Sequence, residues 1–183
     1  MSKIITIPTV RKIDGQQVTE LVTFQVVEAD EWFAEQAYTP KPLPTQQSLD
    51  TLFEGVTRMR LLNGGAANGK ALGTELLLEL SDAPAIAALH RHLSIIEDEN
   101  SFFHCMCMGE QALELYRGLE LIATIGLHHG RSIRWDGWEL DAELVDGHGL
   151  LVWLAEQGVA SPLEKYQESQ RRAEQAFARI RQF

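Results

Sequence analysis

The side chains best suited to chemistry are crowded into one stretch of the chain, residues 102 to 138. This stretch contains both cysteines of the protein, Cys105 and Cys107, and the adjacent pair His128 and His129. Thiolate sulfur and imidazole nitrogen are common ligand atoms of zinc in proteins. These four side chains therefore form a candidate zinc site, provided that the fold brings the two pairs together.

A predicted hairpin brings the two pairs together. Two segments typical of β-strands, residues 112–116 and 119–127, are separated by an Arg-Gly pair, which is a hairpin signal. With this pair at the centre of the turn, Cys107 lies opposite His128. A turn shifted by one residue changes the partners. In either register the Cys-Met-Cys segment meets the His-His segment at the same end of the hairpin.

The spacing of the cysteines leaves three interpretations open. On a strand, residues two apart point to the same face, which suits two sulfurs aimed at one metal ion but is poor geometry for a disulfide. Structural zinc sites usually have two to four residues between their cysteines, and free cysteines are often small buried apolar residues. A Cys-His catalytic pair needs an orienting group, which is not evident. We favour packed, reduced cysteines without a cofactor, and zinc is the alternative.

Two arginines of the same stretch, Arg131 and Arg134, stand out in an acidic protein. They either pair with carboxylates of neighbouring strands, such as Glu110, Glu114 or Glu139, or they line an anion-binding cleft with the two histidines. The second interpretation gives a candidate ligand-binding set, which consists of His128, His129, Arg131 and Arg134.

The composition narrows the class of function. The 183-residue chain has a formal net charge of −10 and a pI near 5.0, which argues against a general binder of nucleic acids or anionic membranes. No apolar run approaches the roughly 20 residues of a membrane span, and the N-terminus lacks the hydrophobic region of a signal peptide. Two cysteines and no others suit a reducing compartment. We expect a cytoplasmic protein.

The acidic charge also suits a basic protein partner. The run Glu97, Asp98 and Glu99 is the best candidate for a contact with such a partner. We therefore predict a protein partner, with a basic toxin domain as the candidate, and no nucleic-acid or membrane partner.

The pattern of strands and helices predicts an α+β fold with a mainly antiparallel sheet, because the strand-like segments come as hairpins and a meander without a repeated β-α-β pattern. We expect a single domain, residues 1–183, with a candidate subdivision into residues 1–47 and 48–183. The expected elements are a hairpin over 3–27, a short helix over 30–38, a proline-rich connector over 39–47, strands over 56–62 and 75–80 joined by a long flexible loop, helices over 81–95, 146–158 and 161–182, and a third meander strand over 131–135.

The last of these helices has an apolar stripe at helical spacing, formed by Leu163, Tyr166, Ala173, Phe177 and Ile180. We expect it to dock through Phe177 and Ile180. A buried phenylalanine replaced by alanine costs about 3 kcal/mol of stability. The oligomeric state is left open.

Residues 102 to 158 resemble a segment of uncharacterised bacterial proteins. The resemblance is carried by Cys-x-Cys-x-Gly, then His-His-Gly-x-Ser-x-Arg-Trp, then a short helix with Trp-Leu. It implies a bacterial source and a module that stands beside varied neighbours, and it transfers no catalytic residue.

Two classes of function follow. Small size, acidic charge, α+β architecture and the lack of a complete catalytic motif favour an interaction protein of the immunity type, which binds and neutralises a cognate toxin. The alternative is a small-ligand or metal-binding domain, or an enzyme, with its site at the Cys-His end of the meander.

Overall fold

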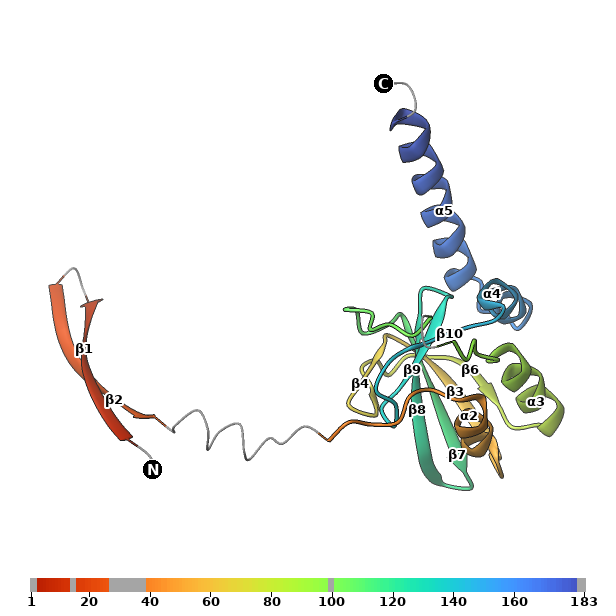
Figure 1. The fold of residues 1–183 in the computed structure, drawn as a ribbon, viewed down its shortest axis with the longest axis horizontal. Coiled ribbons are helices and arrows are strands. Elements are labelled where there is room, and N and C mark those ends of the chain that lie inside the picture. Colours follow the sequence, from red (N-terminus) through yellow and green to blue (C-terminus); the bar gives the residue numbers. More distant parts are fainter. Residues whose placement is uncertain (1–2, 14–15, 27–38, 99–100, 181–183) are drawn as a thin grey trace. The chain divides into compact units, whose positions relative to one another are not determined.

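The computed structural model describes residues 3–13, 16–26, 39–98 and 101–180, and the chain forms two compact units, residues 1–40 and 41–183 (Figure 1). In the first unit, β1 (Lys3–Ile13) and β2 (Gln16–Val26) pair along their whole length as an antiparallel hairpin. The unit boundary falls in the proline-rich connector. The short helix predicted over residues 30–38 lies outside the described residues.

The second unit is built on a six-stranded sheet with the order β10-β9-β8-β7-β3-β6. Every pairing in it is antiparallel, which confirms the predicted α+β fold with a mainly antiparallel sheet. Its strands are β3 (Arg58–Asn63), β6 (Leu76–Leu80), β7 (Gln111–Arg117), β8 (Glu120–His128), β9 (Ser132–Trp135) and β10 (Ala142–Glu143).

Three helices of this unit begin at side chains that cap free backbone N–H groups. Thr45, Asp82 and Asp146 accept hydrogen bonds from N–H groups in the first turns that follow them, as short polar side chains do at this position. The helices are α2 (Gln46–Phe53), α3 (Ala83–His92), α4 (Gly147–Glu156) and α5 (Ser161–Ile180).

One face of the sheet packs against α2, α3 and α4 to form the apolar core. Side chains alternate between the faces of a strand, so every second residue of the central strands joins this core. On β8 these residues are Ala123, Ile125 and Leu127. The helices contribute buried leucines, among them Leu49, Leu89 and Leu154.

The other face carries the intervening residues of β8, namely Thr124, Gly126 and His128, and these too are buried. A ribbon of two short strands, β4 (Ala66–Ala67) and β5 (Lys70–Ala71), contacts β8 and covers part of this face. We predicted a long flexible loop here. The ribbon forms because Asn68 and Gly69 both take positive φ, 50° and 70°, as a tight hairpin turn requires.

The C-terminal helix extends beyond the body that it starts from (Figure 1). A 20-residue helix is about 30 Å long. Among its side chains up to residue 178, those that pack lie in the first turns, with Pro162 buried and Leu163 and Tyr166 half-buried. Phe177 is 65% exposed. The prediction that Phe177 docks the helix is therefore wrong, because an apolar stripe does not show whether another surface lies opposite it. The side chain of Ile180 is outside the described part.

We now expect the substitution Phe177→Ala to change the free energy of unfolding by less than about 0.5 kcal/mol, as is usual for surface positions. The matched control is Leu154→Ala in α4. Leu154 is 1% exposed, and its truncation should cost about 3 kcal/mol because it leaves a cavity in the core. Urea unfolding of both variants checks this. A loss at Phe177 comparable with that at Leu154 would show that the end of α5 is covered in solution.

Candidate metal site

The hairpin β7–β8 sets the end of the sheet at which the site lies. Its turn pairs Arg117 with Glu120, one residue further along the chain than our first choice of register. Gly118 takes a φ of 62° in this turn, a conformation that favours glycine. The pairing shifts again between Leu115 and Tyr116. β7 begins at Gln111, and both cysteines precede the strand.

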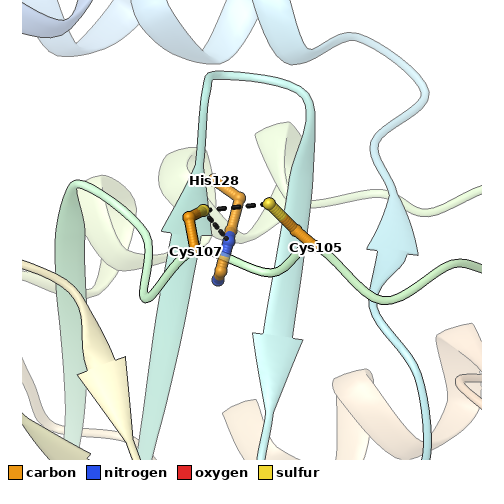
Figure 2. A group of neighbouring side chains, drawn as sticks. All are labelled: Cys105, Cys107 and His128. Carbon is orange, nitrogen blue, oxygen red and sulfur yellow. Dashed lines mark hydrogen bonds between the residues drawn. The ribbon is translucent and has the colours of Figure 1, made fainter.

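The cysteines lie on a curved segment without regular secondary structure, which we call the cysteine arch, residues 105–107. Our prediction that a strand points Cys105 and Cys107 to one face is therefore wrong. The arch instead turns Met106 outward, 92% exposed, and brings the two sulfurs to 2.9 Å from each other. Figure 2 shows the sulfurs converging beside the ring of His128.

The two histidines face the same sulfurs. His128 Nδ1 is 3.1 Å from Cys107 Sγ. His129 Nε2 is 3.2 Å from Cys107 Sγ and 3.7 Å from Cys105 Sγ. A tetrahedral zinc ion lies about 2.3 Å from sulfur and about 2.0 Å from nitrogen, so its ligand atoms are about 3.3–3.8 Å apart. The ligand atoms of Cys105, Cys107 and His128 all lie within 4.8 Å of one another, so small adjustments of these three side chains enclose such an ion. His129 Nε2, which faces both sulfurs, is the candidate fourth ligand.

His128 is held as a neutral ligand. It ends β8 and is 0% exposed. Its ring occupies the space beside two glycines, where a side chain would crowd it. A Cβ at Gly109 or Gly126 would come within 3.2 or 3.1 Å of His128 Nε2. Burial, together with the nearby Arg134 guanidinium, lowers the pKa of His128 to about 4. The imidazole therefore stays uncharged near neutral pH, as metal binding requires.

His129 is positioned by its backbone and by one carboxylate. It takes a φ of 55°, which turns the chain back after β8. Glu110 accepts hydrogen bonds from its backbone N–H at 2.7 Å and from Nδ1 at 2.6 Å. Burial acts to lower the pKa of His129, but its hydrogen bond with Cys105 and its contacts with Glu110 outweigh burial and raise it. A carboxylate behind a histidine typically orients a metal ligand.

The two thiols differ in acidity. Hydrogen bonds from the side chain and backbone of Cys107 lower the pKa of Cys105, and His129 adds to the effect. Burial, and then the hydrogen bond with Cys105, raise the pKa of Cys107. Cys105 is therefore the thiol that loses its proton first.

An internal ion pair fixes the shape of the cysteine arch. Arg134 donates from Nη1 to the carbonyl of Cys107 at 3.0 Å and from Nη2 to the carbonyl of Cys105. The same guanidinium donates to Asp141 at 2.6 and 2.9 Å, and Asp141 also accepts from the backbone N–H of Cys105 at 3.0 Å. Arg134 thus holds the backbone that carries the sulfurs, and the small cavity that it borders contains neither histidine.

Arg131, the last residue of the predicted ligand-binding set, has a side chain that is 66% exposed and pairs with Glu143 at 3.1 Å. His129 and Arg131 do share a groove of about 380 Å³ with Tyr166 of α5. The buried His128 does not line this groove, so this groove does not contain all four residues.

The acidic run predicted to bind a partner makes contacts within the protein. The carboxylate of Glu97 accepts a hydrogen bond from the backbone N–H of Gln46. The carbonyl of Asp98 accepts one from the N–H of Ser101 at 2.8 Å. Glu99 lies outside the described residues.

Sequence reasoning missed Glu110, Asp141 and the glycines that make room for His128. Glu110 appeared only as a strand carboxylate that pairs with arginine. The signal that could have identified Glu110 was its position beside Gly109, just before β7. A carboxylate at that end of β7 faces the turn after β8. Asp141 had no local signal.

The low pKa of His128 predicts a pH dependence of stability in the metal-free, reduced protein. An unfolded histidine binds a proton below its ordinary pKa of 6.5, whereas His128 in the folded state does so only below about 4. The free energy of unfolding should therefore fall as the pH falls through this window, by up to about 3 kcal/mol. His128→Gln should flatten this part of the pH profile measured by urea unfolding. An unchanged slope would mean that other groups cause it.

Comparison of the chain with protein-family models, with curated proteins and with solved structures gave no match. Across the described residues, none of the helices combines the length and the apolar character needed to cross a membrane.

Proposed function

We propose that the protein binds one divalent transition-metal ion, with zinc as the preferred ion, through Cys105, Cys107, His128 and His129. The observation that carries this proposal is the convergence of two sulfurs and two imidazole nitrogens, with contacts of 2.9 to 3.7 Å, from segments more than twenty residues apart in the chain. Packing alone does not require three potential ligand atoms to lie within 4.8 Å of one another and a fourth to face the same two sulfurs.

The ligand set favours zinc. Two thiolates and two imidazoles in a tetrahedral arrangement are typical of zinc, whereas magnesium and calcium prefer oxygen ligands. Glu110 supplies the hydrogen bond to His129 that outer residues commonly give to a zinc-bound histidine. Four protein ligands leave no position for a substrate, so the site is structural and not catalytic.

The metal would fasten an irregular segment to the sheet. Residues 104 to 110 have no regular secondary structure, and they are held by the Arg134 contacts and by the ribbon, where Ala66 N–H donates to the carbonyl of Met108 at 2.8 Å. An ion between this segment and the turn after β8 adds a further link. A cytoplasmic location, in which both thiols stay reduced, suits this role.

The predicted immunity-type function stays a prediction. The net charge of −10 suits a basic partner, and the exposed face of α5 around Phe177 adds apolar surface. A structural metal site is compatible with such an interaction protein.

Metal analysis of the reduced, full-length protein tests the proposal. We expect about one equivalent of zinc per chain, and uptake of the same amount by metal-free protein in a titration against a coloured chelator. Cys107→Ser and His128→Gln should abolish stoichiometric binding. Glu110→Gln should weaken zinc binding by about 10–100-fold, as is typical for outer residues.

His104→Gln is the matched control, because His104 adjoins Cys105 in sequence and is exposed, and it is not one of the four proposed ligands. It should bind zinc like the unaltered protein. Zinc content that is negligible in the unaltered protein, or unchanged in Cys107→Ser, would refute the proposal.

A further inference from the structure

We propose that Cys105 and Cys107 also form a reversible disulfide by exchange with a small organic disulfide, and that this disulfide and the metal ion exclude each other. The metal part of this inference rests on the proposed function, whereas the disulfide part depends only on the cysteine arch.

The separation of the sulfurs supports both states. Their distance is 2.9 Å. A disulfide needs about 2.05 Å, and two thiolates on one tetrahedral zinc ion lie about 3.8 Å apart. The distance between the sulfurs therefore changes by only about 0.9 Å, whether they form the disulfide or bind zinc. Our expectation that the Cys-x-Cys spacing disfavours a disulfide assumed a strand, and the arch removes that obstacle.

The surroundings of the arch allow this movement while keeping the sulfurs together. Arg134 holds the two cysteine carbonyls, so the backbone stays curved while the side chains rotate. Met106, between them, is 92% exposed and packs against little. Both cysteines are partly exposed, so a small disulfide can reach them from solvent.

The exchange proceeds in two balanced steps. The thiolate of one of the two partly exposed cysteines attacks one sulfur of the small disulfide, and one small thiolate leaves. The other cysteine, after losing its proton to solvent, attacks the sulfur of the first cysteine in the resulting mixed disulfide, and the second small thiolate leaves. The two cysteines lose two electrons in total, and the small disulfide gains them as it becomes two thiols.

Oxidation must then displace the metal. The disulfide removes both thiolates, and the two remaining imidazoles are half of the ligand set. Zinc keeps its charge throughout and passes to solvent, because it takes no part in the redox step. Conversely, bound zinc occupies both thiolates and should slow their attack on the small disulfide.

Oxidised glutathione is the probe for the first test, applied to metal-free full-length protein and followed by intact mass spectrometry. The expected product is a protein lighter by two hydrogen atoms, which a dithiol reductant restores. Cys107→Ser should instead stop at one glutathione attached to Cys105. Met106→Ala is the control and should behave like the unaltered protein. Two attached glutathiones without an internal disulfide, or no reaction, would overturn the inference.

The second test uses zinc-loaded protein with the same probe and a coloured zinc chelator. We expect oxidation at least about tenfold slower than in metal-free protein, with about one equivalent of zinc released per disulfide formed. A disulfide-containing protein that retains its zinc would overturn the mutual exclusion. A protein that forms the disulfide but never binds zinc would refute the proposed function and leave the disulfide standing.

Discussion

Removal of zinc by a chelator should lower the melting temperature of the reduced protein by on the order of 10 °C. An ion that binds only the folded state stabilises it by about 4 kcal/mol when free zinc is a thousand times the dissociation constant. For a domain of this size, each kcal/mol shifts the melting temperature by about 2–4 °C. Thermal unfolding with and without chelator, at fixed zinc concentration, measures the effect, and added zinc should reverse it.

The doubly substituted protein Cys105→Ser/Cys107→Ser is the control for the chelator. Serine keeps the size of each side chain but removes the sulfur ligands, so its melting temperature should not respond to chelator. Equal melting temperatures of the unaltered protein in zinc and in chelator would contradict the prediction, because the cluster would then be held by packing alone.

Truncation of Asp141 should destabilise the protein by about 3–5 kcal/mol, the usual cost of breaking a buried ion pair from one side. Asp141 is 0% exposed, and the side chain of Arg134 is only 19% exposed. Asp141→Ala would leave this guanidinium without a counter-charge and would free the N–H of Cys105. Urea unfolding measures the loss, and zinc affinity should fall with it because the arch loses its support.

Glu143→Ala is the matched control. Its partner Arg131 has a side chain that is 66% exposed, and exposed ion pairs contribute only about 0–1 kcal/mol. Similar losses in Asp141→Ala and Glu143→Ala would mean that the internal pair is solvated and does not fix the arch.

The sequence predicted the parts of the fold that local patterns determine. Alternating apolar residues gave the antiparallel strands, and Asp82 and Asp146 marked the starts of α3 and α4. The hairpin turn was enough to bring Cys107 within 3.2 Å of both histidines, even though the register was one residue off at the turn. A hairpin juxtaposes its two ends over several residues, so this result tolerates a small slip.

The sequence could not predict the shape of the cysteine arch. Local propensity does not determine the path of residues 105–107, because the Arg134 side chain, more than twenty residues away, holds it through their carbonyls. The partner of that arginine, Asp141, likewise follows from tertiary structure. The prediction that the end of α5 docks failed for a related reason. The apolar stripe of a helix shows which side is apolar but not whether another surface covers that side.

The order of the strands has a consequence for how the chain folds. Strands β7 to β10 follow one another in the chain and pair in that order, so they form a first group. Strands β3 and β6 form a second group, with only the ribbon between them in the chain. The pairing of β3 with β7 joins the two groups. Contacts between residues close in sequence form fastest, because their loops are short. All four proposed ligands lie in one short span beside the first group, from the cysteine arch to the turn after β8. Zinc can therefore bind before the sheet is complete, and we expect it to speed refolding and not merely to slow unfolding.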